Sequence, residues 1–297
     1  MNQAQTKQNT RARETSQPLQ NSFALKKLQG IKPKGVKAKD NSNLENLLNI
    51  FDMNWSDFLK SRINLPRAHI STTECLDLKR ETKTYYPQIN YSESDLISFI
   101  FSKSRPEDAI YSEYVGMYTS ALLEMLIESN KNEGKRTVLY LDGQGNDFPY
   151  LFYHLNDIDI LILNNMSSFN LCYNFGFPGG KKINMLIGIN IEDDQVFRNT
   201  KGGSSGGLLA GYNINGRRSF DVKEKSAEFD WIVGENVCGG NSLMLINKFA
   251  CSFDELNYSA KQVMSLIKSI PKKSYDEVIK TALKIESIYK SILPKEE

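Results

Sequence analysis

Four short apolar segments follow Gly134 and constrain the fold more than any other feature of the sequence. They read TVLYL (137–141), IDILIL (158–163), INMLIGINI (183–191) and FDWIV (229–233). Runs of this length and composition are typical of strands covered on both faces, as in a mainly parallel sheet. The segments between them can hold helices or loops, and we expect no internal repeat. The runs therefore predict a layered α/β domain.

The chain divides into three predicted regions. Residues 1–40 hold nine Lys/Arg and two acidic residues, with few aromatic residues, so we expect 1–41 to be a disordered basic tail. Apolar residues recur at three- and four-residue steps in 42–133, which indicates a helical N-terminal region. The remainder, 134–297, is expected to be the α/β core, and helical spacing returns after Phe253.

Several classes of protein are disfavoured by composition. No apolar run is long enough to span a bilayer, and the polar N-terminus lacks the apolar core of a secretory signal. The four cysteines form no C-x-x-C pair and the two histidines lie far apart, so we expect no metal site and a reducing, cytoplasmic compartment. The Gly/Ser-rich segment 199–216 is expected to be a surface loop.

The segment VLYLDGQGND, beginning at Val138, is typical of a strand that leads into a ligand-binding loop. Asp142, Gly143 and Gly145 would form that loop, because glycines let a backbone approach a ligand closely. Residues 148–155 would then form a helix, with Asp147 as its cap and a proline in its first turn. A helix there would favour cofactor binding, and a strand would remove the pocket.

This segment resembles the class I S-adenosylmethionine-dependent methyltransferases, particularly the ribose 2′-O type. The segment SFDVKEKSAEFDWIV is similar to the family's adenine-contacting acid, at Asp221, followed by its apolar strand. The resemblance implies a Rossmann-like, mostly parallel sheet flanked by helices, with S-adenosylmethionine near Asp142, Gly143 and Gly145. It implies that Glu235 and Lys248 face the acceptor, which would be RNA or a host macromolecule.

A second resemblance predicts that the same region forms a β-hairpin. The run from 136 to 170, with ENVCGGNSLMLINKF after it, resembles YopJ-type effector acetyltransferases and adenovirus-type cysteine proteases. The resemblance implies that Cys238 is a nucleophile at a helix N-terminus, where the helix dipole favours the thiolate. Asp147 stands where that family has its catalytic histidine, and Asn164 stands at its acid position.

A third hypothesis is a non-enzymatic protein that binds RNA or a host protein. The basic tail would contact nucleic acid, and such binding would be strongly salt-dependent. Basic leaders also occur on secreted bacterial effectors, which would place the protein in a host cytoplasm as a virulence factor. The methyltransferase is the leading hypothesis, and the thiol effector and the binding protein remain as alternatives.

Overall fold

The computed structural model describes residues 42–62, 70–85, 90–104, 108–175, 183–192, 195–198, 204–216, 227–237, 240–246 and 253–294. Contacts divide the chain after Asn41, and the described residues all belong to the unit from Ser42 to Glu297. The predicted tail, 1–41, therefore lies outside the described residues. None of the helices found in the described ranges is both long enough and apolar enough to cross a membrane.

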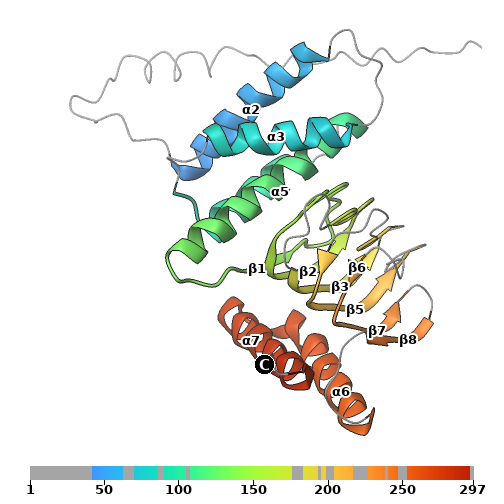
Figure 1. Cartoon of the computed structure of the whole chain (residues 1–297). Coiled ribbons are helices and arrows are strands. Elements are labelled where there is room, and N and C mark those ends of the chain that lie inside the picture. Colours follow the sequence, from blue (N-terminus) through green and yellow to red (C-terminus); the bar gives the residue numbers. More distant parts are fainter. Residues whose placement is uncertain are drawn as a thin grey trace, which may run out of the picture. The chain divides into compact units, whose positions relative to one another are not determined.

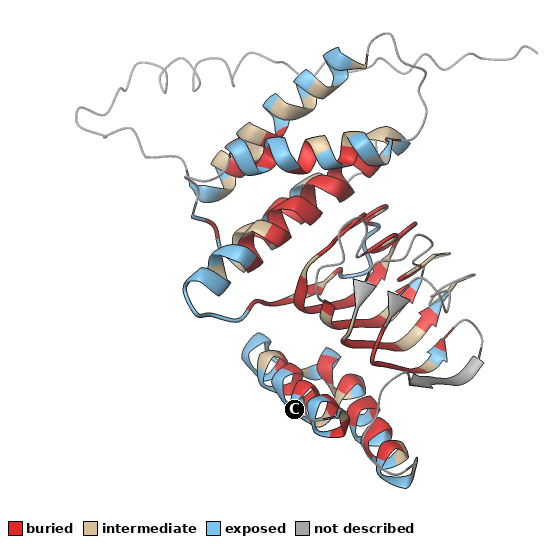
Figure 2. Cartoon of the chain, viewed as in Figure 1, coloured by how far each residue is buried: buried red, intermediate tan, exposed pale blue. Residues whose placement is uncertain are grey.

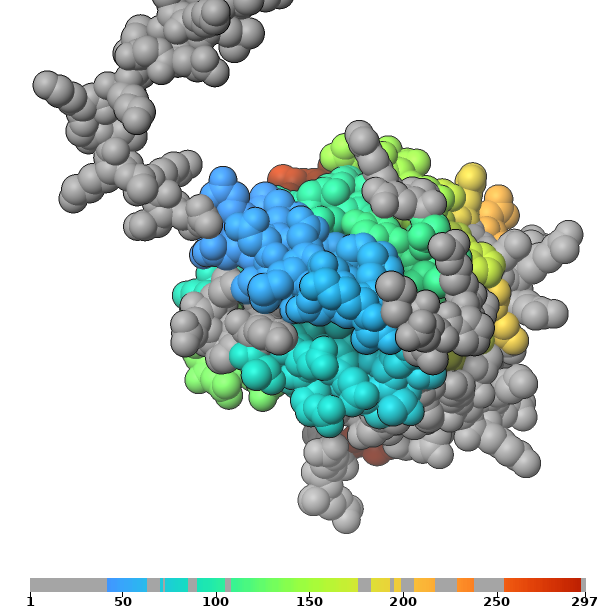
Figure 3. Space-filling model, turned by 90° about the horizontal axis from the view of Figure 1, so that it is seen from above, coloured from blue at the N-terminus to red at the C-terminus, as the bar shows by residue number. Residues whose placement is uncertain are grey.

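Four helices precede the sheet. They are α2 (Asn43–Ser61), α3 (Thr72–Tyr85), α4 (Glu93–Lys103) and α5 (Ala109–Asn132). Ser42 and Ser92 begin α2 and α4 with reciprocal capping boxes, and the Asp108 side chain caps α5. Most of α5 is buried (Figure 2), whereas α2 and α3 expose one side. Seen from above, atoms of these helices, coloured blue to green, occupy the middle of the visible face (Figure 3).

Five parallel strands follow in chain order, and a sixth strand closes the sheet. They are β1 (Val138–Asp142), β2 (Ile158–Ser167), β3 (Ile183–Glu192), β5 (Leu208–Asn215), β7 (Trp231–Val237) and β8 (Gly240–Ile246). Each strand from β1 to β7 pairs in parallel with the next in this sequence, and β8 pairs with β7 in the antiparallel direction. A second, two-stranded sheet joins β4 (Ser204–Ser205) to β6 (Ala227–Glu228).

This arrangement is a parallel β-solenoid of about three turns over 138–237, so the predicted Rossmann-like fold is wrong. A Rossmann-like sheet requires helical crossovers between its parallel strands. Between β1 and β7, the described connections contain turns, bends and short strands instead of helices. The helices of the described ranges come before and after the strands (Figure 1).

Residues 148–155 form neither the expected helix nor the alternative strand. They form consecutive turns in which Tyr150, Phe152 and His154 adopt left-handed backbone conformations, with φ of 61°, 57° and 59°. Asp147 caps no helix but makes an isolated parallel bridge with Ser167. The hairpin implied by the thiol resemblance is also wrong, because residues 148–155, which were to pair with 158–163 as its first strand, form turns.

The turn segments stack on one another and form a second wall of the solenoid, opposite the strands. The Tyr150 N–H donates to the Phe169 carbonyl at 2.6 Å, and the Cys172 N–H donates to the Leu151 carbonyl at 2.8 Å. The next turn continues the stack, since the Phe197 N–H donates to the Leu171 carbonyl at 3.0 Å. We call this surface the turn wall: residues 148–155, 168–175 and 195–198.

The strand register shows an internal repeat, which corrects the expectation that there is none. Val138, Ile160, Met185, Leu208 and Trp231 occupy equivalent positions, so equivalent residues of successive strands are 22, 25, 23 and 23 residues apart. The sequence carries this repeat as GINI, GYNI and GENV, at residues 188–191, 211–214 and 234–237. A fixed spacing of this size is the signature of a solenoid.

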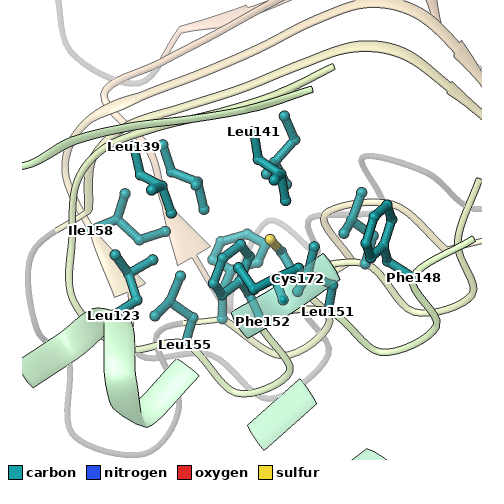
Figure 4. Close-up of a cluster of buried hydrophobic side chains, with 14 of the residues drawn as sticks. Leu123, Leu139, Leu141, Phe148, Leu151, Phe152, Leu155, Ile158 and Cys172 are labelled. Atoms are coloured by element: carbon teal, nitrogen blue, oxygen red, sulfur yellow. The ribbon is translucent and has the colours of Figure 1, made fainter. Parts of the chain in front are cut away.

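The sheet has an apolar layer on each face. The inner face packs against the turn wall and α5, and Figure 4 shows this core with Leu123, Leu139, Phe152, Leu155 and Cys172 among its residues. The outer face packs against α6 (Phe253–Ser269) and α7 (Tyr275–Ile292), which are joined by η1 (Ile270–Lys272). Both faces of the strands are therefore covered, as their continuous apolar composition requires.

A polar cluster ties the start of the strands to α7. The Arg136 guanidinium donates to Asp159 and to Glu286, and Asn184 donates to Glu286 at 2.8 Å. Burial opposes ionisation of Glu286, but the hydrogen bonds from Arg136, Lys290 and Asn184 outweigh it and lower the pKa to about 2. The carboxylate of Glu286 is therefore charged throughout the physiological range.

Candidate ligand-binding groove

Four asparagines occupy equivalent positions at the point where each strand bends. Asn165, Asn190, Asn213 and Asn236 lie in left-handed conformations, with φ of 51°, 50°, 53° and 55°. Asparagine tolerates this conformation better than most residues with a side chain. The repeated bend therefore selects asparagine and places one carboxamide on each of four neighbouring strands.

The carboxamides are joined in a directed chain of hydrogen bonds. Asn236 Nδ2 donates to Asn213 Oδ1 at 2.9 Å, and Asn213 Nδ2 donates to Asn190 Oδ1 at 3.0 Å. Asn190 Nδ2 reaches the buried Asn164 at 3.4 Å, although Asn165 occupies the equivalent backbone position. We call Asn164, Asn190, Asn213 and Asn236 the asparagine ladder.

The ladder ends at a carboxylate. Asn164 Nδ2 donates to Asp142 Oδ2 at 3.1 Å and to the Tyr140 hydroxyl at 3.2 Å. Asp142 Oδ1 also accepts the Gln144 N–H at 2.9 Å. Burial, together with the adjacent Asp142, raises the pKa of Tyr140, so that hydroxyl stays protonated. Asp142 thus accepts the last hydrogen bond of the asparagine ladder. Because a carboxylate can only accept, each carboxamide of the ladder donates toward Asp142.

A groove of about 490 Å³ runs along these bends. It is lined by Gly145, Asn165, Met166, Ser167, Asn190, Glu192, Asn213, Asn215 and Asn236. Five of these nine residues are asparagines, and Glu192 is the one ionisable residue among the nine. Because these described lining residues include no Lys or Arg, the part of the groove that they form presents amide donors and acceptors without cationic charge.

The glycine loop predicted from the sequence lies at one end of the groove. Gly145 lines it with φ of 75°, and its N–H donates to the Asn165 carbonyl at 2.7 Å. Gly143 allows close approach of the next strand, since a Cβ there would lie 2.5 Å from that of Met166. These glycines shape a turn against β2, and binding of S-adenosylmethionine by this loop stays a prediction.

Of the remaining predicted site residues, the structure describes Glu235, which lies away from that loop. Glu235 stands on β7 in the same row as Asp142, with three strands between them, and forms a 2.6 Å ion pair with Lys268 of α6. Asp221, Cys238 and Lys248 lie outside the described residues. The helix expected to follow Cys238 is wrong, because residues 240–246 form β8.

The described cysteines do not fit a nucleophile. Cys75 and Cys172 are both buried. Burial raises the pKa of the Cys75 thiol to about 11, and the nearby carboxylates of Glu124 and Glu113 raise it further against the opposing effect of Lys79. The described ranges also contain no group of His, Cys, Asp and Glu side chains suited to a metal ion.

Sequence reasoning missed the asparagine ladder, although its signal was present. A glycine, an asparagine two residues later and the apolar residue after it recur at a spacing of 23 residues in β3, β5 and β7. A comparison of the apolar runs with one another would have aligned Asn190, Asn213 and Asn236. Comparison with protein-family models, curated proteins and solved structures gave no match, so the groove is assigned from this chain alone.

Proposed function

We propose that this protein is a non-enzymatic binding protein whose asparagine-lined groove takes a neutral, hydroxyl-rich ligand, an oligosaccharide chain. The observation that carries the proposal is the hydrogen-bonded row of carboxamides along a groove whose described lining residues are not cationic. It develops the hypothesis of a binding protein and places recognition on the solenoid instead of the tail.

The chemistry of the ladder suits sugar hydroxyls. A carboxamide has two N–H donors and an oxygen with two lone pairs. Within the ladder, Asn213 uses one donor toward Asn190 and one lone pair toward Asn236. One donor and one lone pair remain for a ligand, and a hydroxyl group both donates and accepts hydrogen bonds.

The geometry favours a chain over a single small molecule. Neighbouring strands lie about 4.8 Å apart, so the carboxamides repeat at that interval in the direction that crosses the strands. An extended polymer lying across β2, β3, β5 and β7 would meet the same pair of groups at each strand. The ladder bonds already fix the amide orientations, which reduces the side-chain entropy lost on binding.

Charge argues against an anionic ligand in this groove. Glu192 is exposed and none of the described lining residues is cationic, so a phosphate chain in contact with them would meet repulsion without a compensating ion pair. RNA binding by the basic tail stays a separate prediction about residues outside the described ranges. Binding of S-adenosylmethionine also stays a prediction, although the helical crossover on which it rested is replaced by the turn wall.

The test is calorimetric titration with graded series of neutral cello-, malto- and chito-oligosaccharides. We expect affinity to rise with chain length until the ladder is spanned. Asn213→Gly preserves the left-handed bend but removes one carboxamide, and it should weaken binding by about 1 kcal/mol, or about fivefold.

Asn49→Ala is the matched control, because Asn49 is an exposed asparagine of α2, remote from the groove in the fold. It should leave the affinity unchanged. Absence of binding to every neutral series, or equal binding by wild type and Asn213→Gly, would overturn the proposal. Binding of RNA or S-adenosylmethionine that is sensitive to Asn213→Gly would also overturn it.

A further inference from the structure

The groove contains one asparagine whose chemical surroundings differ from those of the ladder. Asn215 ends β5, is exposed and lines the groove. It is followed by Gly216, and this is the one Asn-Gly pair in the sequence. The Asn215 carboxamide makes no hydrogen bond to another side chain or backbone group within the described ranges.

We propose that Asn215 is a site of spontaneous deamidation that adds a second acidic side chain to the groove, beside Glu192. The backbone nitrogen of Gly216 attacks the Asn215 side-chain carbonyl carbon, and a new C–N bond forms. The bond from that carbon to the side-chain amide nitrogen breaks, and this nitrogen leaves as ammonia. Water then opens the resulting succinimide at either carbonyl, giving aspartate or isoaspartate at position 215. The reaction consumes one water, releases one ammonia and needs no oxidant or enzyme.

Glycine makes position 216 favourable for this attack. It has no Cβ to crowd the ring closure, and its backbone reaches conformations that other residues avoid. The chain bends at Gly216, where β5 has ended, so its nitrogen is not part of a strand ladder. An exposed carboxamide also gives water direct access to the succinimide.

The asparagines at the strand bends are protected by comparison. Asn165, Asn190, Asn213 and Asn236 are followed by Met166, Ile191, Ile214 and Val237, all buried. Side chains of this size, and β-branched ones especially, obstruct ring closure. Asn213 is in addition held by hydrogen bonds on both sides of its carboxamide. The groove thus combines a reactive asparagine with unreactive ones.

Deamidation would change what the groove attracts. Asn215 is the register partner of Glu192 on the neighbouring strand, so the product places two carboxylates side by side. Like charges at paired positions of a sheet repel one another. The modified groove should therefore favour ligands that carry an amine or another cation, and isoaspartate would add a backbone atom at the end of β5.

The experiment is timed incubation of the full chain at neutral and mildly alkaline pH, followed by tryptic digestion and fragment-ion mass spectrometry. Residues 202–217 form one tryptic peptide that contains both Asn213 and Asn215, so each sample carries its own control. A sample digested at time zero corrects for conversion during digestion. We expect the mass gain of an amide-to-acid exchange at Asn215, several-fold faster than at Asn213.

Two variants sharpen the test. Gly216→Val should slow conversion at Asn215 several-fold, and Asn215→Gln should abolish the product. Equal rates at Asn213 and Asn215 would overturn the proposal. So would an unmodified Asn215 in the folded chain when the same residue converts in urea, because the folded strand would then be shown to block the reaction.

Discussion

The strand bends and the turn wall place residues in the same left-handed conformation but fill those positions with different side chains. At the bends, all four positions are asparagine and face the groove. In the turn wall, the positions are Tyr150, Phe152, His154, Asn170, Cys172, Asn174 and Phe197. Where the side chain faces solvent, the residue is one that tolerates the left-handed conformation. Where the side chain enters the core, the free energy gained by burying it outweighs the cost of that conformation.

The strands and the turn wall also differ in the kind of contact that they make with the flanking helices. The strands meet α6 and α7 through an apolar layer, with the Arg136 cluster at one corner. The turn wall meets α3 and α5 through buried polar bonds: Lys79 donates to the His154 carbonyl, and Glu124 accepts the Asn156 N–H at 2.8 Å. The turn wall lacks regular strand pairing and depends on these contacts.

The largest difference between the walls should come from glycine substitution. Phe152→Gly relieves the left-handed backbone but removes a fully buried ring, and we expect a loss of about 4 kcal/mol in the free energy of unfolding. Urea denaturation measures it. Phe169→Gly is the control, since Phe169 is 43% exposed. Equal losses would show that burial does not decide these positions.

Breaking the buried ion pair should have the next largest effect. Lys79 and Glu124 lie 2.6 Å apart with side chains 7% and 5% exposed. Lys79→Met leaves Glu124 charged without its partner, and we expect a loss of about 3 kcal/mol. Lys83→Met removes an exposed, 3.5 Å pair with Glu128 and should change stability by less than about 0.5 kcal/mol.

The double variant Lys79→Met with Glu124→Leu removes both charges and should recover part of that loss. Chemical denaturation of all variants at one pH provides the comparison. If the double variant is less stable than Lys79→Met alone, the uncompensated charge is not the cause.

The polar cluster around Arg136 and Glu286 predicts a smaller effect on stability, and this effect depends on pH. Glu286 has an ordinary pKa of 4.5 and a folded-state pKa of about 2. Its stabilisation is therefore complete above the ordinary value and is lost as the pH falls through about 2. Glu286→Gln should cost about 2 kcal/mol near neutral pH, after allowance for the partly exposed Arg136.

Denaturation of wild type and Glu286→Gln over a range of acidic pH values tests this account. The two stability curves should converge as the pH falls below 4.5. A difference that stays constant down to pH 2 would assign the effect to packing instead of charge.

The smallest expected effect lies at the bends. Asn213→Gly loses its ladder bonds but adopts a φ of 53° freely, so stability should change by less than about 0.5 kcal/mol. Asn213→Ala has no such freedom and should lose about 1 kcal/mol. Thermal unfolding of the pair measures the difference, and equal losses in the two variants would mean that the ladder bonds, which both variants lack, and not the backbone, stabilise the bend.

The sequence predicted the local elements better than their assembly. The apolar runs at 138–142 and 183–191 are strands covered on both faces, because their composition reflects burial directly. That composition does not distinguish a solenoid from a sheet with helical crossovers. The turn wall at 148–155 gave no periodic signal, since its alternating left-handed residues are aromatic and buried.

The candidate site was only partly within reach of sequence reasoning. Asp142 and Gly145 were predicted as loop residues; Gly145 lines the groove, and Asp142 ends β1 and accepts a hydrogen bond from the asparagine ladder. The asparagines that line the groove come from strands 23 or 25 residues apart and meet only through the parallel register. Only a comparison of the apolar runs for a repeat would have brought them together.

The most direct test of the proposed groove is nuclear magnetic resonance of the side-chain amides. In ¹⁵N-labelled protein, the NH₂ signals of Asn190, Asn213 and Asn236 can be assigned by their loss in glycine variants. Titration with a neutral oligosaccharide should shift these signals and leave those of Asn49 and Asn54, on α2, in place. Unmoved ladder signals at saturating oligosaccharide would contradict the account.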